Sequence, residues 1–407
     1  MRSKILFLDQ FGTVGGGQQM LLETLGVVDP GKFEATVALN GPGNLKRLLR
    51  GGGTPVIDLP LGNYHSGRKT IGDIARFGPR TVFCSLFLAS TIVKGHFELI
   101  FANGPRTFAC AALAGRLTKR PVIWHLHNVL SSEAAAKGLS FLASWVSQII
   151  VCSKSAAASL LKYRPSLQSK IRLIYNSVPD WRHTEHEWDT EAWRRSFGLD
   201  KGFVSFGILG RVTPFKGQVQ FIEAARLVLQ HSLKARFFVV GSPAPDCPED
   251  QAYYDELRIQ VENSTMRSHV LFIEHQDEIH RYYSLIDVVV LASQGEEASP
   301  RTIVEAMYLG KPVVAPSQEG VREILRDGDT GFLVETAEPR LLADRMLELL
   351  NEPGKRQILG TAAKEDVIAR FSRGEYQREM RKALTDCFES QGKALGKQVD
   401  PVAVTER

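Results

Sequence analysis

Short apolar runs alternate with helix-length segments along most of this chain. The first run, residues 4–8, predicts a buried strand, and a glycine-rich turn over 12–17 and a helix over 18–25 follow it. Similar runs recur in the first half at residues 36–39, 56–59, 99–102, 122–124 and 149–152. Strands that alternate with helices in this way are typical of a parallel α/β sheet.

The pattern breaks once and then begins again. Residues 181–200 are polar and aromatic and follow no strand or helix period, so we interpret them as an interdomain linker. A second series of apolar runs follows at residues 203–209, 236–240, 270–273, 288–291, 312–315 and 332–334. The fold class is therefore α/β, with two doubly wound parallel-sheet domains over 1–180 and 201–370. From about residue 339 we expect helices, with a frayed end.

Composition adds limits to this picture. With 407 residues, 43% of them hydrophobic and 23% charged, the chain is neither a disordered tail, a collagen, a coiled-coil rod nor a disulfide mini-protein. Five scattered cysteines without a CxxC pair fit a reducing cytosol. The longest nearly uncharged apolar run, residues 81–93, is too short to cross a bilayer and predicts a buried helix. The apolar run at the N-terminus is too short for a signal peptide, so we expect a cytoplasmic protein.

Charge divides the two halves. Residues 1–180 hold 21 Lys or Arg against 9 Asp or Glu, whereas the rest of the chain holds 29 against 36. A basic half can attract an anionic membrane surface or an anionic acceptor, and a charge-biased solvated surface is the alternative. The nearest approach to a cluster is formed by Arg68, Lys69, Arg116, Lys119 and Arg120. There is no Lys/Arg run of the kind that binds nucleic acid, and we expect no nucleic-acid partner.

Two cations, Arg211 and Lys216, follow a predicted strand and precede a predicted helix. Ligands of open α/β sheets lie at the carboxyl ends of strands, where a guanidinium fork and an ammonium group would suit a diphosphate. The stretch lacks the glycine before the lysine and the hydroxyl after it that a P-loop requires. A solvated helix start is the alternative.

The segment 296–307 follows another predicted strand. Ser299 fits an N-cap and Pro300 the first helical position, so the first amides of this helix would form an anion site. Glu297 would lie in the loop and Glu305 in the second helical turn, where the two carboxylates reach different parts of one ligand. A capped helix with two solvated acids is the alternative.

Two weaker signals lie in the first half. The turn over 12–17 could bring backbone amides to a phosphate, but Met20 stands where a dinucleotide fingerprint needs its third glycine. His125 and His127 follow the run 122–124 on one face of the strand, and they are structural, hydrogen-bonding or catalytic. No nearby Cys or carboxylate completes a metal-ligand set with them, so we expect no metal site.

In this order the segments resemble the retaining glycosyltransferases of family 4, which have the GT-B fold of two Rossmann-like domains facing across a cleft. The resemblance covers most of the chain and rests on residues 15–18, 121–127, 152–154, 176–179, 210–217, the Glu297/Glu305 pair, 310–315 and 320–331. Ser177 departs from the glycine that is commoner after Asn176, and Pro300 stands where many members have glycine.

The resemblance implies roles for individual residues. Arg211, Lys216, Gly16 and the amides of Arg301, Thr302 and Ile303 would hold the donor diphosphate, and Glu305 the ribose. His127 and Glu297 would be catalytic, with Glu297 at the transferred sugar, and Gly17, Asn103 and Asn176 would lie near the acceptor or the sugar. The resemblance implies no cofactor and no essential metal, and a C-terminal helix within 371–407 that returns to the first domain.

We therefore expect an enzyme that moves a sugar from a nucleotide diphosphate sugar to a hydroxyl of a glycan, lipid-linked or polysaccharide precursor, with retention of configuration. The basic first half would carry the acceptor, at most in peripheral contact with the inner face of the membrane. The alternatives are a nucleotide-sugar epimerase, a sugar phosphorylase or a non-catalytic sugar-nucleotide-binding protein. The defective glycine fingerprint weighs against a fourth, a nicotinamide oxidoreductase.

Overall fold

Two separate parallel sheets form the framework of the protein. The computed structural model describes residues 2–62, 71–178, 181, 189–200, 202–244, 247–274 and 278–390, with backbone alone for 71–75. The first sheet has the strand order β3-β2-β1-β4-β5-β6-β7, and the second has the order β10-β9-β8-β11-β12-β13. The strands of the first are β1 (Ser3–Asp9), β2 (Phe33–Leu39), β3 (Val56–Asp58), β4 (Leu99–Asn103), β5 (Val122–Leu126), β6 (Gln148–Val151) and β7 (Ile171–Leu173).

The second sheet confirms the second series of apolar runs. Its strands are β8 (Val204–Leu209), β9 (Ala235–Val240), β10 (Val270–Ile273), β11 (Val288–Val290), β12 (Val313–Pro316) and β13 (Phe332–Val334). The two-domain α/β prediction is therefore confirmed. The pattern missed β7, a three-residue edge strand whose residues are only half-buried, because Arg172 interrupts its apolar residues.

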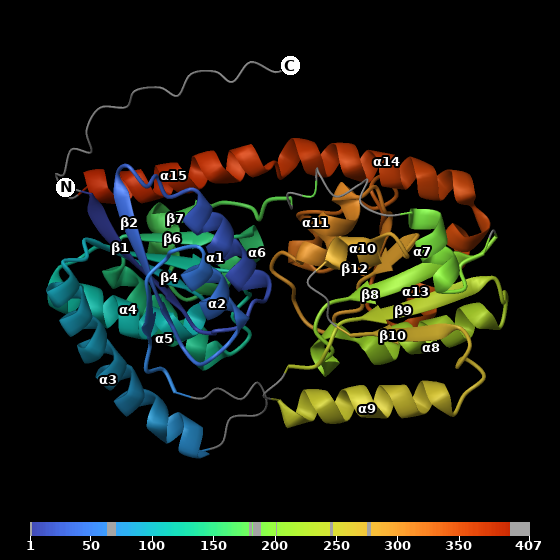
Figure 1. Cartoon of the computed structure of the whole chain (residues 1–407), viewed down its shortest axis with the longest axis horizontal. Coiled ribbons are helices and arrows are strands. Elements are labelled where there is room, and N and C mark those ends of the chain that lie inside the picture. The colour runs from blue at the N-terminus through green and yellow to red at the C-terminus, as the bar shows by residue number, and fades with distance from the viewer. Residues whose placement is uncertain are drawn as a thin grey trace.

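Helices cover both faces of each sheet (Figure 1). Over one face of the first sheet lie α3 (Ile71–Gly95), α4 (Pro105–Thr118), α5 (Glu133–Leu142) and α6 (Lys154–Leu161), and over the other lie α1 (Gly16–Gly26), α2 (Asn44–Gly51) and α15 (Arg373–Glu389). The second sheet is covered on one face by α8 (Gln218–Leu229), α9 (Pro248–Glu262) and α13 (Pro339–Asn351). Its other face carries α10 (Ile279–Tyr283), α11 (Arg301–Tyr308), α12 (Glu319–Arg322) and α14 (Pro353–Arg370).

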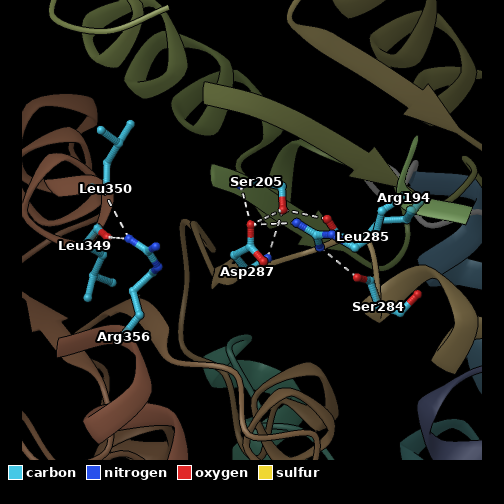
Figure 2. Close-up of polar contacts among 8 residues, drawn as sticks. All are labelled: Arg194, Ser205, Ser284, Leu285, Asp287, Leu349, Leu350 and Arg356. Atoms are coloured by element: carbon cyan, nitrogen blue, oxygen red, sulfur yellow. Dashed lines mark hydrogen bonds and ion pairs between the residues drawn. The ribbon is translucent and has the colours of Figure 1, made fainter. Parts of the chain in front are cut away.

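The stretch predicted as a linker contains a helix, α7 (Thr190–Ser196). Its Arg194 donates to Asp287 (Nη2 to Oδ2, 3.0 Å) and to the Ser284 carbonyl (2.9 Å), and Ser205 donates to the same Asp287 oxygen from β8 (2.8 Å) (Figure 2). These bonds attach α7 to the second sheet. The helix was not predicted because it has only seven residues and its aromatic side chains, which pack against the core of the second domain, follow no clear period.

Helix α15 crosses back to the first sheet. It continues the line of α14 along one side of the molecule (Figure 1), and Tyr376, Met380 and Phe388 are buried in the core that Phe33 also lines. The hydroxyl groups of Tyr376 and Thr24 lie 2.8 Å apart. The last part of the chain, whose fraying was expected, lies outside the described residues.

A helix covers residues 81–93 as predicted, but only one side of it is buried. Residues 81–93 lie within α3, where Cys84, Leu88 and Ile92 are buried, but Phe83 and Leu86 are 62% and 58% exposed. Among the helices that the structure describes, none combines the length and the apolar composition needed to cross a membrane.

Candidate active site

At the carboxyl edge of the first sheet, three polar side chains form a buried network. Parallel register places Asp9 of β1 beside Asn103 of β4. The Asn103 amide donates to Asp9 (Nδ2 to Oδ2, 2.5 Å) and to the Gly17 carbonyl (3.1 Å), and Asn103 Oδ1 lies 2.7 Å from His127 Nε2. The other Asp9 oxygen accepts from Gln18 Nε2 (2.8 Å) and from a backbone amide.

These contacts determine the protonation of His127. Because the Asn103 Nδ2 group faces two acceptors, its Oδ1 must face His127, and Nε2 must carry the imidazole proton. Burial, together with the nearby Arg301 cation, lowers the pKa of His127 to about 3, so the ring is neutral. Its Nδ1 then has a lone pair, and no described residue donates to it. Burial also raises the pKa of Asp9 to about 6.

The second sheet contributes charged pairs. Lys216 ends a short 3₁₀ turn after β8, and its Nζ lies 2.5 Å from Glu297 Oε1, which also accepts from the Ser293 hydroxyl (2.7 Å). Gly217 allows this approach, because its φ of 72° is left-handed and a Cβ there would lie 1.9 Å from the Ala292 carbonyl oxygen. Glycine is also needed at position 320, because a Cβ there would lie 2.0 Å from the Glu297 carbonyl oxygen.

A second pair lies on α11, the helix that follows β11. Arg301 Nη2 lies 3.2 Å from Glu305 Oε1, and both side chains are mostly buried. The other Glu305 oxygen accepts from the hydroxyl of the buried Tyr283 (2.9 Å). Burial and the Glu305 carboxylate raise the pKa of Tyr283 well above its usual value, so this hydroxyl remains a donor.

The two sheets meet at these side chains. A Cβ placed on Gly16 would lie 3.6 Å from Arg301 Cδ, and one on Gly17 would lie 3.5 Å from His127 Cδ2. Arg301 Nη1 also lies 2.9 Å from the sulfur of Met20. The structure thus brings six of the predicted residues together across the two domains and pairs two others, Lys216 and Glu297, on the second. We call these eight residues the inter-sheet site: Gly16, Gly17, Asn103, His127, Arg301, Glu305, Lys216 and Glu297.

The beginning of α11 differs from the prediction by one residue. Pro300, not Ser299, is the N-cap, and α11 begins at Arg301. The predicted Ser299 cap is therefore wrong. Because proline has no side-chain acceptor, no side chain caps the first amides of α11. The amide of Ile303 donates to the Pro300 carbonyl (3.1 Å), which commits it to the helix's own first turn and narrows the expected phosphate-binding amides to those of Arg301 and Thr302.

Two further predicted residues form no side-chain bond to the inter-sheet site within the described structure. Arg211 is exposed at the start of the loop that carries Lys216, with its carbonyl accepting from Gln218 (3.1 Å). Asn176 follows β7 at the edge of the first sheet, where it is buried and its Oδ1 accepts from no residue that the structure describes.

The sequence analysis did not identify Asp9, Ser293 and Tyr283 as parts of the site. Asp9 had a readable signal, because it is an acid at the end of an apolar strand, next to the strand that ends in Asn103. Ser293 and Tyr283 had none, since single hydroxyl side chains carry no recognisable spacing. In the described part of the chain, no group of three or more His, Cys, Asp or Glu side chains is placed to hold a metal ion.

Two doubly wound domains whose strand ends meet at paired cations and carboxylates define the GT-B class. The family model "Glycosyltransferase Family 4" matches residues 14–182, and "Glycosyl transferases group 1" matches residues 189–366. The chain belongs to the family 4 type of GT-B glycosyltransferases, as the sequence motifs indicated.

Known relatives agree with this assignment. Spore coat protein SA of Bacillus subtilis is 27% identical over 56% of this chain, but the match covers only 61% of that relative, less than two thirds of its length. The capsular polysaccharide biosynthesis glycosyltransferase CapM of Staphylococcus aureus is 21% identical over 67% of this chain and 73% of its own. The crystal structure of Anabaena Alr3699/HepE in complex with UDP and glucose is similar over 94% of this chain and 100% of its own, with a TM-score of 0.79 and 25% identity.

Proposed function

We propose that the protein transfers a hexose from a nucleotide diphosphate sugar to a hydroxyl of a glycan or lipid-linked polysaccharide precursor, with retention of anomeric configuration. The observation that carries the proposal is the pairing of Lys216 with Glu297 and of Arg301 with Glu305, with Arg301 beside the glycine turn of the first domain. A similar protein has been solved with UDP-glucose, so UDP-glucose is the first donor to test.

The charged half of the site suits the donor. In the proposed reaction the bond from the anomeric carbon to the diphosphate oxygen breaks, and the acceptor oxygen bonds to the same face of that carbon. The acceptor's proton passes to the departing diphosphate. Lys216, Arg211 and the first amides of α11 would offset the charge of this leaving group. Glu305 would accept from the ribose, and Glu297 from the transferred sugar.

The neutral half suits the sugar. His127 Nδ1 can accept a hydrogen bond from a sugar hydroxyl, and the Asn103 contact keeps the ring in the required tautomer. We propose no cofactor and no essential metal, since Lys216 and Arg211 would offset the diphosphate charge in place of a metal. Activity measured in EDTA should match activity in added Mg²⁺, and a loss in EDTA would contradict this part.

Isothermal titration with a panel of nucleotide sugars, followed by assays with candidate acceptors, tests the proposal. The expected result is selective binding of one donor and a product whose anomeric proton coupling matches that of the donor. An inverted product would contradict retention. Conversion of the donor to an epimer without acceptor would favour the epimerase alternative, and binding without any turnover would favour a non-catalytic protein.

We also propose that the protein works in the cytoplasm. Its five cysteines are buried, and no disulfide joins them in the described structure, as a reducing compartment would require.

A further inference from the structure

Exposed apolar side chains gather on one helical layer of the first domain. Among the residues that the structure describes, thirteen large hydrophobic side chains are exposed, and seven belong to α3, α4 or α5. They are Phe77, Val82, Phe83, Leu86, Val93, Leu117 and Phe141. We call this set the outer apolar face.

The members of this set share one side of the molecule. Cys84 of α3 and Phe108 of α4 are buried in the same core, on the same face of the first sheet, and Leu139 of α5 packs against it. Their opposite sides therefore point away from that sheet together. Figure 1 shows α3 as a long helix along the outside of the first domain. An apolar helix face in that position has no partner within the described structure.

The surroundings of the outer apolar face are strongly basic. Between residues 74 and 172 the chain has 13 Lys or Arg and only 2 Asp or Glu. Exposed cations on these helices or directly after them are Arg76, Arg80, Lys94, Arg116, Lys119 and Lys137. Beside Phe141 lies a surface hollow of about 270 Å³, lined by Lys137, Ser140, Phe141, Tyr163 and Arg164. Arg68 and Lys69, which the sequence also suggested, lie outside the described residues.

We propose that the outer apolar face docks onto an anionic phospholipid bilayer. Apolar side chains flanked by cations are the composition of helices that lie in the membrane interface, where the apolar side enters the acyl boundary and the cations meet anionic headgroups. The excess of positive charge favours this occupant over a second copy of the chain, because two such faces would repel each other.

The position of α3 connects this surface to the inter-sheet site. The helix joins two parallel strands of one sheet, β3 and β4, so it begins at the carboxyl edge of that sheet. Arg80, in the first half of α3, lies against Gly62 just after β3, and a Cβ on Gly62 would be 3.0 Å from the guanidinium carbon. The part of the outer apolar face nearest the start of α3, with Phe77, would thus bring a docked bilayer toward the edge that carries His127, where a lipid-linked acceptor could reach.

Flotation with vesicles tests the proposal, without donor or acceptor, so its outcome is independent of the transfer reaction. The full chain should float with vesicles of phosphatidylcholine and phosphatidylglycerol, but much less with phosphatidylcholine alone. The double substitution Phe83→Ser and Leu86→Ser should weaken binding by about tenfold or more, because two large apolar side chains leave the interface. Added salt should also weaken it, since exposed charges are screened over about 8 Å at physiological ionic strength.

The matched control is Ile259→Ser with Ile358→Ser. These side chains are 61% and 70% exposed, but they lie on α9 and α14 of the second domain. The control should float like the wild type, and both variants should bind the nucleotide as the wild type does. Absence of flotation at low salt, or equal loss in the control, would overturn the proposal. A dimer in light scattering that Phe83→Ser and Leu86→Ser dissociate would assign the surface to self-association instead.

Discussion

The side chains from the first sheet at the inter-sheet site are buried and form hydrogen bonds, whereas those from the second sheet form ion pairs. His127 is neutral because burial and the Arg301 cation depress its pKa to about 3. Lys216 and Glu297, in contrast, lie 2.5 Å apart with part of each side chain exposed. A neutral group that is held in one orientation selects ligand groups by whether they donate or accept a hydrogen bond. A charged group selects them by their charge.

This difference indicates how the two halves would respond to a ligand. An ion pair can exchange its partner, so Lys216 can turn from Glu297 to a diphosphate oxygen, while the Glu297 carboxylate keeps the bond from the Ser293 hydroxyl. The Asp9–Asn103–His127 network cannot exchange partners, because each contact depends on the orientation of the next. We expect changes in the charged half to reduce nucleotide binding, and changes in the neutral half to reduce transfer.

The largest effect should come from Lys216→Ala. It removes a charge-assisted bond to the diphosphate, worth about 1.5–3 kcal/mol, which corresponds to roughly tenfold to 150-fold in affinity for UDP. Isothermal titration checks this, with Lys234→Ala, an exposed lysine on the same domain, as the control. If both variants bind UDP like the wild type, Lys216 does not contact the diphosphate.

The two glutamates should differ in which measurement they change. Glu305→Gln should weaken UDP binding by about tenfold, because it weakens the acceptor for the ribose hydroxyls. Glu297→Gln should leave UDP binding within about threefold and lower kcat instead, because its expected partner is the sugar. Titration with UDP and with the intact donor separates the two effects. Equal loss of UDP affinity in both variants would contradict this placement.

Asp9→Asn tests the hydrogen-bond network of the first sheet. The new amide group would face Asn103 Nδ2, so Asn103 would have to turn and present its NH₂ to His127. His127 would then carry its proton on Nδ1, with the opposite hydrogen-bonding sense toward the ligand. We expect kcat to fall by about tenfold with UDP affinity unchanged. Nitrogen chemical shifts of the His127 ring report the tautomer, and unchanged shifts with lost activity would point to a merely structural role for Asp9.

Much of the fold could be predicted because buried parallel strands leave apolar runs. The runs 204–209 and 288–290 are apolar since both faces of the sheet are covered. The exposed half of α3 could not be predicted in this way. The apolar sequence of 81–93 is the same whether Phe83 faces a core or solvent. The sheet beneath the helix buries only one of its sides, and the sequence does not show whether anything covers the other.

The site shows the same limit. Lys216, Glu297 and Glu305 stand in motifs whose spacing is local, and the sequence indicated all three. The Lys216–Glu297 contact joins residues 81 positions apart, and Asp9–Asn103 joins residues 94 apart. Such contacts depend on which strands become neighbours. Only the register of the folded sheet places Asp9 beside Asn103.

The pH dependence of transfer should also separate the halves. Burial raises the pKa of Asp9 to about 6, so its carboxylate is ionised above pH 6 and takes up a proton below it. The proton would occupy an oxygen that accepts from Asn103 or Gln18, and kcat should therefore fall as pH decreases through 6, by up to about tenfold per unit. Rates measured from pH 5 to 8 check this. Asp9→Asn should lack the step, and a step that persists in this variant would belong to another group.

The smallest effect should come from Tyr283→Phe. The substitution removes the hydroxyl that donates to Glu305 Oε2 and preserves the ring, while Arg301 still pairs with the other carboxylate oxygen. Loss of one hydrogen bond to a group that keeps its ion pair should weaken UDP binding by about threefold to tenfold, with kcat unchanged. The matched control is Tyr254→Phe, a buried tyrosine of the same domain on the opposite face of the sheet. If Tyr283→Phe changes kcat but not UDP affinity, Glu305 acts on the transferred sugar, and the contrast between the two glutamates has to be reversed.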